Sequence, residues 1–128
     1  MLEKLTTEVI ESIFDTLPLE VSFVDDTDMV MYYSKGDDRI FRRTPAVIGR
    51  KVQDCHPKAS VEKVEQVVSE LKSGSRDVAE FWIDLKGRTV YIRYFAVRDG
   101  AGKYLGVLEV TQDITDFKKI EGEKRLMD

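Results

Sequence analysis

The adjacent residues Cys55 and His56 carry the most reactive side chains of this sequence, and each is the only residue of its type among 128. A closed zinc site usually takes four cysteine or histidine ligands, which one copy of this chain cannot supply. A cysteine nucleophile needs a histidine base within hydrogen-bond reach, whereas adjacent side chains tend to point apart. The pair therefore predicts neither a metal site nor cysteine-hydrolase chemistry.

Haem is the cofactor that this count of ligands does not exclude, because a single histidine beside an apolar pocket is enough to bind its iron. His56 is followed by Pro57, a residue that suits the first turn of a helix. We interpret His56 and Cys55 as structural, partly buried residues that lead into a helix. Haem ligation by His56 and redox sensing by Cys55 remain the alternatives.

A second candidate site lies in the run RTVYIRYFAVR, residues 88–98, which has the alternation of a strand. One face of this strand is apolar and includes Tyr94, and the other combines Arg93 with aromatic residues. Arg93 has two interpretations: it binds an acidic ligand, or it forms an internal ion pair with Glu80 or Glu109 on a neighbouring strand. We expect the ion pair.

Trp82 and Tyr94 are aromatic residues, which belong to a core more often than to a cofactor site. With the residues above they complete the set of candidate ligand-binding residues, which is His56, Cys55, Trp82, Arg93 and Tyr94. A separate basic cluster is expected to be a solvated surface rather than an anion site. Its members are Arg39, Arg42, Arg43, Arg50 and Lys51.

The elements that must position these residues begin with an amphipathic helix over residues 1–17, which ends before Pro18. Its apolar residues recur at steps of three and four: they are Leu2, Leu5, Val9, Ile13 and Leu17. Strand-forming residues follow at 19–26 and 29–34, separated by an acidic turn, which predicts a hairpin. Short helical turns and loops are expected over residues 36–57.

A longer helix is predicted to begin near Ala59, with Ser60 as its cap, and to end at Gly74. Three strand-like runs follow, and glycine in both of the turns between them predicts an antiparallel meander. These runs span residues 78–85, 88–98 and 103–112.

Residues 116–128 are predicted to form a charged amphipathic helix that Asp113 or Thr115 caps. The whole order predicts an α+β fold, a five-stranded antiparallel sheet with helices on one face and amphipathic helices at both termini. The expected organisation is an N-terminal helix at 1–17, a core at 18–115 and a C-terminal linker helix at 116–128.

Composition limits the functions that this fold can serve. The chain has 128 residues and is 42% hydrophobic, which suits one domain with one core. Its net charge of -4 argues against nucleic acid as a partner. No stretch approaches the roughly 18 apolar residues of a membrane span, so no membrane association is expected. A single cysteine indicates a reducing environment, and the expected location is the cytoplasm.

Three segments of the chain, in this order, resemble the PAS domain family of sensory modules. LPLEVSFVDDTDMVMYYS is similar to the first hairpin of the family, and TPAVIGRKVQDCHPKAS to its passage into the long helix. GKYLGVLEVTQDITDFKKIE is similar to its last strand, which contains a glycine and leads to Asp113, Ile114 and Thr115. The chain looks most similar to PAS modules of anaerobic bacteria and archaea whose proteins also carry a hemerythrin-like domain.

This resemblance implies the PAS fold and a non-enzymatic role. Such a module binds a small ligand or a partner domain and relays its state through its terminal helices to an output module. Asp113, Ile114 and Thr115 match the signal exit of the family, which ties the last strand to the output helix. The apolar sides of the terminal helices favour a homodimer or docking to adjacent domains of a longer protein.

The resemblance also bears on cofactors. Haem-binding members typically carry the ligand histidine within the long helix, whereas His56 precedes that helix. Flavin photoreceptors of the family need an Asn-Cys-Arg-Phe context, but this chain has no asparagine and its Cys55 lies in Asp-Cys-His-Pro. Flavin is therefore not expected, haem is not favoured, and the ligand stays unknown. Enzymatic activity is not expected either, because Glu80, Arg93 and Glu109 form no recognisable catalytic constellation.

Overall fold

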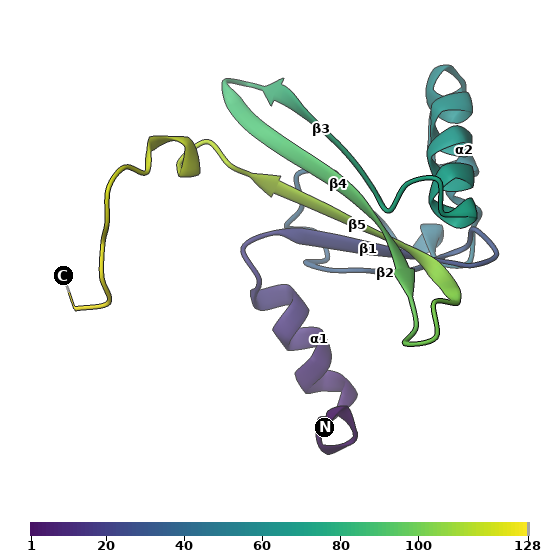
Figure 1. The fold of residues 1–128 in the computed structure, drawn as a ribbon, viewed down its shortest axis with the longest axis horizontal. Coiled ribbons are helices and arrows are strands. Elements are labelled where there is room, and N and C mark those ends of the chain that lie inside the picture. Colours follow the sequence, from purple (N-terminus) through teal and green to yellow (C-terminus); the bar gives the residue numbers. More distant parts are fainter. Residues whose placement is uncertain (128) are drawn as a thin grey trace.

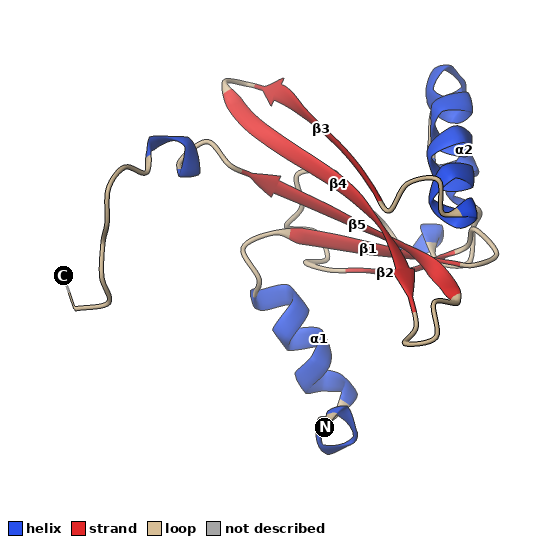
Figure 2. Ribbon diagram, in the orientation of Figure 1, coloured by secondary structure: helices blue, strands red, loops and turns tan. Residues whose placement is uncertain are grey.

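The computed structural model describes residues 1–127. Within them, five strands form one antiparallel sheet in the order β2-β1-β5-β4-β3 (Figures 1 and 2). The hairpin and the meander predicted from the sequence are both confirmed. The strands are β1 (Glu20–Asp25), β2 (Val30–Tyr33), β3 (Val78–Leu85), β4 (Arg88–Arg98) and β5 (Tyr104–Asp113).

Side-chain alternation gives the sheet two different faces. The inner face carries Val24, Ala96 and Val107, which pack in the core with Leu71 of helix α2 (Lys58–Ser73). The outer face carries the residues between them on the same strands, for example Phe23. Leu71 is completely buried, so the core is centred between the inner face and α2.

Helix α2 covers the inner face and ends where the sequence predicted. Gly74 follows it in the left-handed conformation, with a φ of 84°, which glycine adopts at little cost. The start differs from the prediction, because Pro57 takes the N-cap position and the Ser60 hydroxyl donates to the Pro57 carbonyl at 3.0 Å. Short 3₁₀ turns at Pro45–Val47 and Val52–Cys55 precede α2, as expected for that region.

Helix α1 (Thr7–Thr16) is shorter than the helix predicted over residues 1–17. A 3₁₀ turn at Leu2–Lys4 precedes it, and Thr6 then starts the regular helix. The Thr6 hydroxyl oxygen accepts a hydrogen bond from the Val9 N–H at 3.1 Å, which satisfies one of the free donors of the first turn. No helix within residues 1–127 is long and apolar enough to cross a membrane.

Helix α1 lies on the opposite side of the sheet from α2 (Figure 1). Its Phe14 contacts Tyr32 of β2, with 5.7 Å between the ring centroids. Tyr32 is the register partner of Phe23, so both rings belong to the outer face. The prediction of helices on one face therefore describes α2 and the 3₁₀ turns, whereas α1 contacts the outer face.

The C-terminal linker helix predicted over residues 116–128 is wrong for the described part of that segment. Beyond β5 the chain forms only a 3₁₀ turn at Phe117–Lys119 and then runs without helix to Met127 (Figure 1). Gly122 has a φ of 62°, outside the right-handed helical region. Ile120 is 72% exposed, so little packing compensates the cost of starting so short a helix. Asp128 lies outside the described residues.

Arg39 is buried, which corrects its assignment to a solvated basic cluster. Its side chain is 1% exposed and lies 3.7 Å from the Glu20 carboxylate, which is itself 3% exposed. The guanidinium donates to the carbonyls of Ser34 and Phe41, each at 2.9 Å. Glu20 in turn accepts hydrogen bonds from the backbone N–H groups of Ile40 and Phe41. This network fastens the loop after β2 to the start of β1.

Candidate functional site

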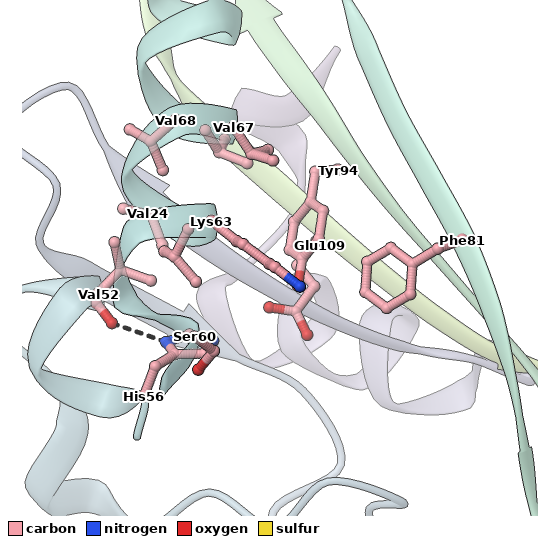
Figure 3. Close-up of a pocket in the computed structure, with 12 residues that line it drawn as sticks. Val24, Val52, His56, Ser60, Lys63, Val67, Val68, Phe81, Tyr94 and Glu109 are labelled. Carbon is pink, nitrogen blue, oxygen red and sulfur yellow. Dashed lines mark hydrogen bonds between the residues drawn. The ribbon is translucent and has the colours of Figure 1, made fainter. Parts of the chain in front are cut away.

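A cavity of about 460 Å³ lies between the inner face of the sheet and α2 (Figure 3). Its wall is mostly aliphatic, with a small number of polar side chains. Two of the predicted ligand-binding residues, His56 and Tyr94, line it. The full lining is Val24, Val52, His56, Ser60, Lys63, Val64, Val67, Val68, Phe81, Tyr94, Val107 and Glu109.

Short side chains on α2 explain why this space stays open. The helix presents Val64, Val67 and Val68 to the cavity at helical spacing, and Figure 3 shows the last two. Valine is small and has few rotamers in a helix, so these residues line the space without reaching across it. One turn later, the larger Leu71 fills the core beside the cavity.

Tyr94 and Glu109 form the polar side of the cavity on the sheet. They are direct partners in the register of β4 and β5, so their side chains lie next to each other on the inner face. Burial raises the pKa of the Tyr94 hydroxyl, and the negative charge of Glu109 raises it further. Tyr94 therefore stays protonated and keeps a donor at the cavity wall. Glu109 is buried and lies 3.6 Å from the guanidinium of Arg43.

Lys63 and Ser60 are cavity residues that sequence reasoning missed. Lys63 extends from α2 between the helix and the sheet, with its ammonium toward Glu109 (Figure 3). Helical spacing could have found both, because Ser60 and Lys63 precede Val67 by seven and four positions and so share its side of the helix. The cavity thus has an aliphatic body and one polar end, at which Lys63, Tyr94 and Glu109 converge.

His56 lines the cavity at the start of α2, and Cys55 does not. The His56 Nδ1 lies 2.9 Å from the Val52 carbonyl (Figure 3). Since a carbonyl only accepts, Nδ1 is the donor in this contact, and Nε2 is the acceptor of the tautomer that carries its proton on Nδ1. Cys55 is partly buried against the core, and its thiol lies 3.6 Å from the Lys51 carbonyl. Adjacency in sequence therefore does not bring the two side chains into one site.

Trp82 and Arg93 lie on the outer face and do not line the cavity. Trp82 is 66% exposed and contacts Tyr91 with 6.3 Å between ring centroids. The Arg93 guanidinium lies 5.0 Å from the Tyr91 ring centroid and 5.4 Å from that of Phe95. Alternation in the sequence separates the two faces of a strand but does not say which face meets the helix. The sequence alone could therefore not separate Trp82 and Arg93 from the residues of the ligand pocket.

The internal ion pair expected for Arg93 is absent among residues 1–127. Glu109 lies on the inner face, where Arg43 pairs with it. Glu80 is the register partner of Arg93, but its carboxylate accepts a hydrogen bond from the Tyr91 hydroxyl. The Nε of Arg93 is buried and makes no hydrogen bond with any described residue.

The segment predicted to be the signal exit, Asp113–Thr115, is tied to the start of β4. Asp113 accepts hydrogen bonds from Arg88 Nε at 2.8 Å and from the Thr115 hydroxyl at 2.6 Å. The Thr115 oxygen accepts from the Thr89 N–H at 2.8 Å, and the Ile114 N–H donates to the Thr89 carbonyl at 2.9 Å. Asp113 and Thr115 therefore stabilise a turn where the sequence predicted a helix cap.

We expect the stabilisation by Asp113 to disappear in acid. Hydrogen bonds from Arg88 and then from Thr115 lower the pKa of the Asp113 carboxyl from 3.8 to about 2. A carboxyl with a lowered folded-state pKa stabilises the fold above its unfolded pKa, here 3.8, and this contribution is lost as the pH falls through about 2. Urea denaturation should show that Asp113→Asn is less stable than wild type at pH 6, by a margin that shrinks steadily below the unfolded pKa. Asp37→Asn, in an exposed loop, is the control. A stability difference between Asp113→Asn and wild type that stays constant throughout this acid range would contradict the lowered pKa of Asp113.

Comparison with known proteins places this geometry in a family. The profile of the PAS domain family matches residues 10–115. The C-terminal domain of a protein from Streptococcus mutans is 39% identical, with a TM-score of 0.85 over 91% of this chain and 91% of that chain. A search of curated proteins finds no match.

More distant solved structures share the fold. A sensory box sensor histidine kinase from Vibrio cholerae is 11% identical, with a TM-score of 0.59 over 84% of this chain and 91% of that chain. VqmA from Vibrio cholerae, described as a dimer, is 22% identical, with a TM-score of 0.63 over 95% of this chain and 58% of that chain.

These findings confirm the resemblance stated on three sequence segments, and the five-stranded sheet agrees with it. The closer similarity to hemerythrin-linked modules stays a prediction. PAS domains are sensory modules, found in histidine kinases among other proteins, and are typically non-catalytic. From the profile that covers most of its length and from its fold, this chain belongs to the PAS domain family.

Proposed function

We propose that this PAS domain senses a small, largely apolar molecule in the cavity beneath α2 and relays its bound state as a homodimer. The observation that carries the proposal is the cavity. Small-molecule sites typically enclose about 300–1,000 Å³ and combine apolar walls with a few convergent polar groups. The space between the inner face and α2 has both properties. Interiors are otherwise close-packed, so an opening of this size favours an occupant.

The polar end of the cavity supports a ligand with one hydrogen-bonding group on an apolar body. Tyr94 keeps a donor at the wall, and Lys63 and Glu109 offer opposite charges beside it. Groups of this kind fix the orientation of a ligand, while the surrounding valines supply affinity through apolar contact. His56, with its Nε2 free to accept, is the polar group at the start of α2.

Strand β5 supports the proposed route from the cavity to the rest of a longer protein. Val107 and Glu109 line the cavity, and the same strand ends at Asp113 in the signal exit. A ligand that displaces Glu109 would therefore act on the strand whose end Arg88 and Thr115 hold. A homodimer is supported by the exposed apolar side of α1, which the domain itself leaves open.

Haem is the second candidate, and one observation favours it. His56 is at the cavity wall, and the bond from Nδ1 to the Val52 carbonyl leaves Nε2 as the nitrogen that could bind iron. His56 would be the protein ligand, and Lys63 would supply a cation for a propionate group. Cys55, the candidate for redox sensing, does not face the same space.

Native mass spectrometry of freshly purified protein, with an absorption spectrum of the same sample, tests the proposal. We expect a retained small molecule in wild type, and its loss in Val64→Phe, whose larger ring projects into the cavity and obstructs it. Val78→Phe makes the same change on the outer face, where the valine is 41% exposed, and should keep the ligand. Re-addition of the molecule at about 100 times its Kd should raise the free energy of unfolding of wild type by roughly 2.7 kcal/mol.

The outcomes separate the candidates. A Soret band that His56→Ala removes would replace the first candidate with haem sensing. A ligand that binds equally well to Val64→Phe would place its site outside the cavity. A protein that retains no molecule and gains no thermal stability from any compound of an apolar ligand library would overturn the ligand-sensing proposal.

A further inference from the structure

The polar end of the cavity beneath α2 has hydrogen-bond donors that the domain does not use. Lys63 extends from α2 toward the sheet, with its ammonium toward Glu109 (Figure 3). Among residues 1–127 this ammonium forms neither an ion pair nor a hydrogen bond, and the Tyr94 hydroxyl makes no hydrogen bond either. Burial raises the pKa of the Tyr94 hydroxyl, which therefore keeps its proton. Two donors, one from the helix and one from the sheet, thus lack acceptors.

Charge at this end of the cavity is also unbalanced. Glu109 carries the one carboxylate among the lining residues, and the guanidinium of Arg43 lies 3.6 Å from it. The Arg43 and Glu109 side chains are only 18% and 11% exposed, so they attract each other more strongly than a surface pair does. Arg43 therefore balances the charge of Glu109. Lys63 adds a positive charge that no acid among residues 1–127 balances.

Exposure places this unbalanced charge at the mouth of the cavity. Lys63 on α2 and Phe81 on β3 are lining residues that are also exposed to solvent. Val68 and Val107, which line the same space, are buried. The cavity therefore opens between α2 and β3, with its aliphatic wall behind the opening. A ligand that enters with its apolar part first would leave its polar group beside Lys63, where that group stays partly hydrated.

A carboxylate fits this polar end better than other head groups do. It has two acceptor oxygens and no donor, so that one oxygen accepts from Lys63 and the other from Tyr94. A neutral amide or alcohol would use the same donors but would leave the charge of Lys63 unbalanced. An amine would bring a further cation beside Lys63 and would compete with Arg43 for Glu109.

We propose that the ligand of this cavity is a monocarboxylic acid with an apolar tail, whose carboxylate binds Lys63 and Tyr94 at the mouth. This inference rests on the proposed function, because it names the ligand class of the same cavity. The tail lies against the valines of α2 and of the sheet, which supply affinity through apolar contact. The two donors at the mouth select the head group.

Titration calorimetry at neutral pH, with three probes that share one tail and differ in the head group, tests the ligand class. Octanoate should bind wild type about tenfold more tightly than octanamide, and octylamine should bind most weakly. Lys63→Met should raise the Kd of octanoate roughly fivefold or more and leave that of octanamide unchanged. Lys58→Met makes the same change in the first turn of α2, at an exposed lysine that does not line the cavity, and should leave both values unchanged.

The outcomes separate the ligand class from the existence of a ligand site. Equal binding of octanoate and octanamide, both lost in Val64→Phe, would overturn this inference and leave the proposed function standing. Tightest binding of octylamine would also overturn it and would assign the head group to Glu109.

The molecule retained by freshly purified protein gives a second readout, which does not depend on the tail of the probes. Mass spectrometry of an extract should show an acid that loses carbon dioxide on fragmentation. A retained neutral or basic molecule would overturn the inference and support the proposed function. A protein that retains no molecule and binds none of the three probes would overturn the inference as well.

Discussion

Gly106→Ala is expected to reduce the free energy of unfolding by more than about 3 kcal/mol, among the largest effects of any single methyl group in this domain. A Cβ at this position would overlap the carbonyl oxygen of Val24 and would lie 2.8 Å from Cζ of Phe23. The φ of 153° adds strain for any residue with a side chain. Since β1 and β5 are paired inner strands, the overlap could be relieved only if the two strands moved apart.

Urea denaturation of Gly106→Ala beside Gly100→Ala measures this effect. Gly100 lies in the β4–β5 turn, where a Cβ would meet no atom within 4 Å and the backbone is not in the left-handed region. Its replacement should change stability by no more than about 0.5 kcal/mol. Equal effects of the two variants would show that the approach of Gly106 to β1 is not what requires glycine. The close approach of β1 to Gly106 also explains why the last strand contains a glycine, one of the features in which this chain resembles the PAS family.

Arg39→Ala is expected to cost about 3–5 kcal/mol, because it leaves the Glu20 carboxylate buried without its cation. The same substitution removes donors to the carbonyls of Ser34 and Phe41, which are then left without these bonds. The loop after β2 should lose its attachment to β1, which faster amide hydrogen exchange at Ile40 and Phe41 would report.

Thermal and urea unfolding of Arg39→Ala, with Arg42→Ala as the control, measure the cost. Arg42 is an exposed arginine of the same loop, and its replacement should be close to neutral. The double variant Arg39→Met with Glu20→Gln should recover part of the stability, because it removes both charges and keeps an amide oxygen for the loop N–H groups. A single Arg39→Ala variant as stable as Arg42→Ala would contradict the assignment of a buried ion pair.

The sheet could be predicted from the sequence because its strands are long, alternate regularly and are separated by turns with strong local preferences. Residues 78–85 and 88–98 were placed with their observed bounds. The end of α2 was equally clear, since Gly74 marks it by a conformation that few other residues adopt. Local residue preferences determine these features, so a single sequence is enough to predict them.

Features that depend on tertiary contact were missed. Arg39 reads as one more basic residue of a polar loop, and only the fold brings it to Glu20, nineteen positions earlier. The helix predicted after β5 has a suitable pattern of residues, but Ile120 is left mostly exposed, and Gly122 interrupts the helix. Pattern alone therefore overestimated helix at the end of the chain.

The candidate cavity was predicted only in part, because it also depends on tertiary contacts. Tyr94 and His56 were both proposed, but their common cavity with Glu109 depends on the register of β4 against β5 and on where α2 lies. Trp82 and Arg93 have the composition of a binding site and lie on the other face. A shift of one residue in a strand exchanges its faces, which is why composition could not place them.

The position of β1 beside β5 has a mechanical consequence. Glu20 at the start of β1 pairs with Thr111 near the end of β5, so the chain enters and leaves the sheet at the same end of two adjacent strands. A force that pulls the two ends apart would open the hydrogen bonds between these strands one after another, as a zipper opens, rather than load them together in shear. The domain should therefore yield to weak tension along the chain even where its core resists heat and urea.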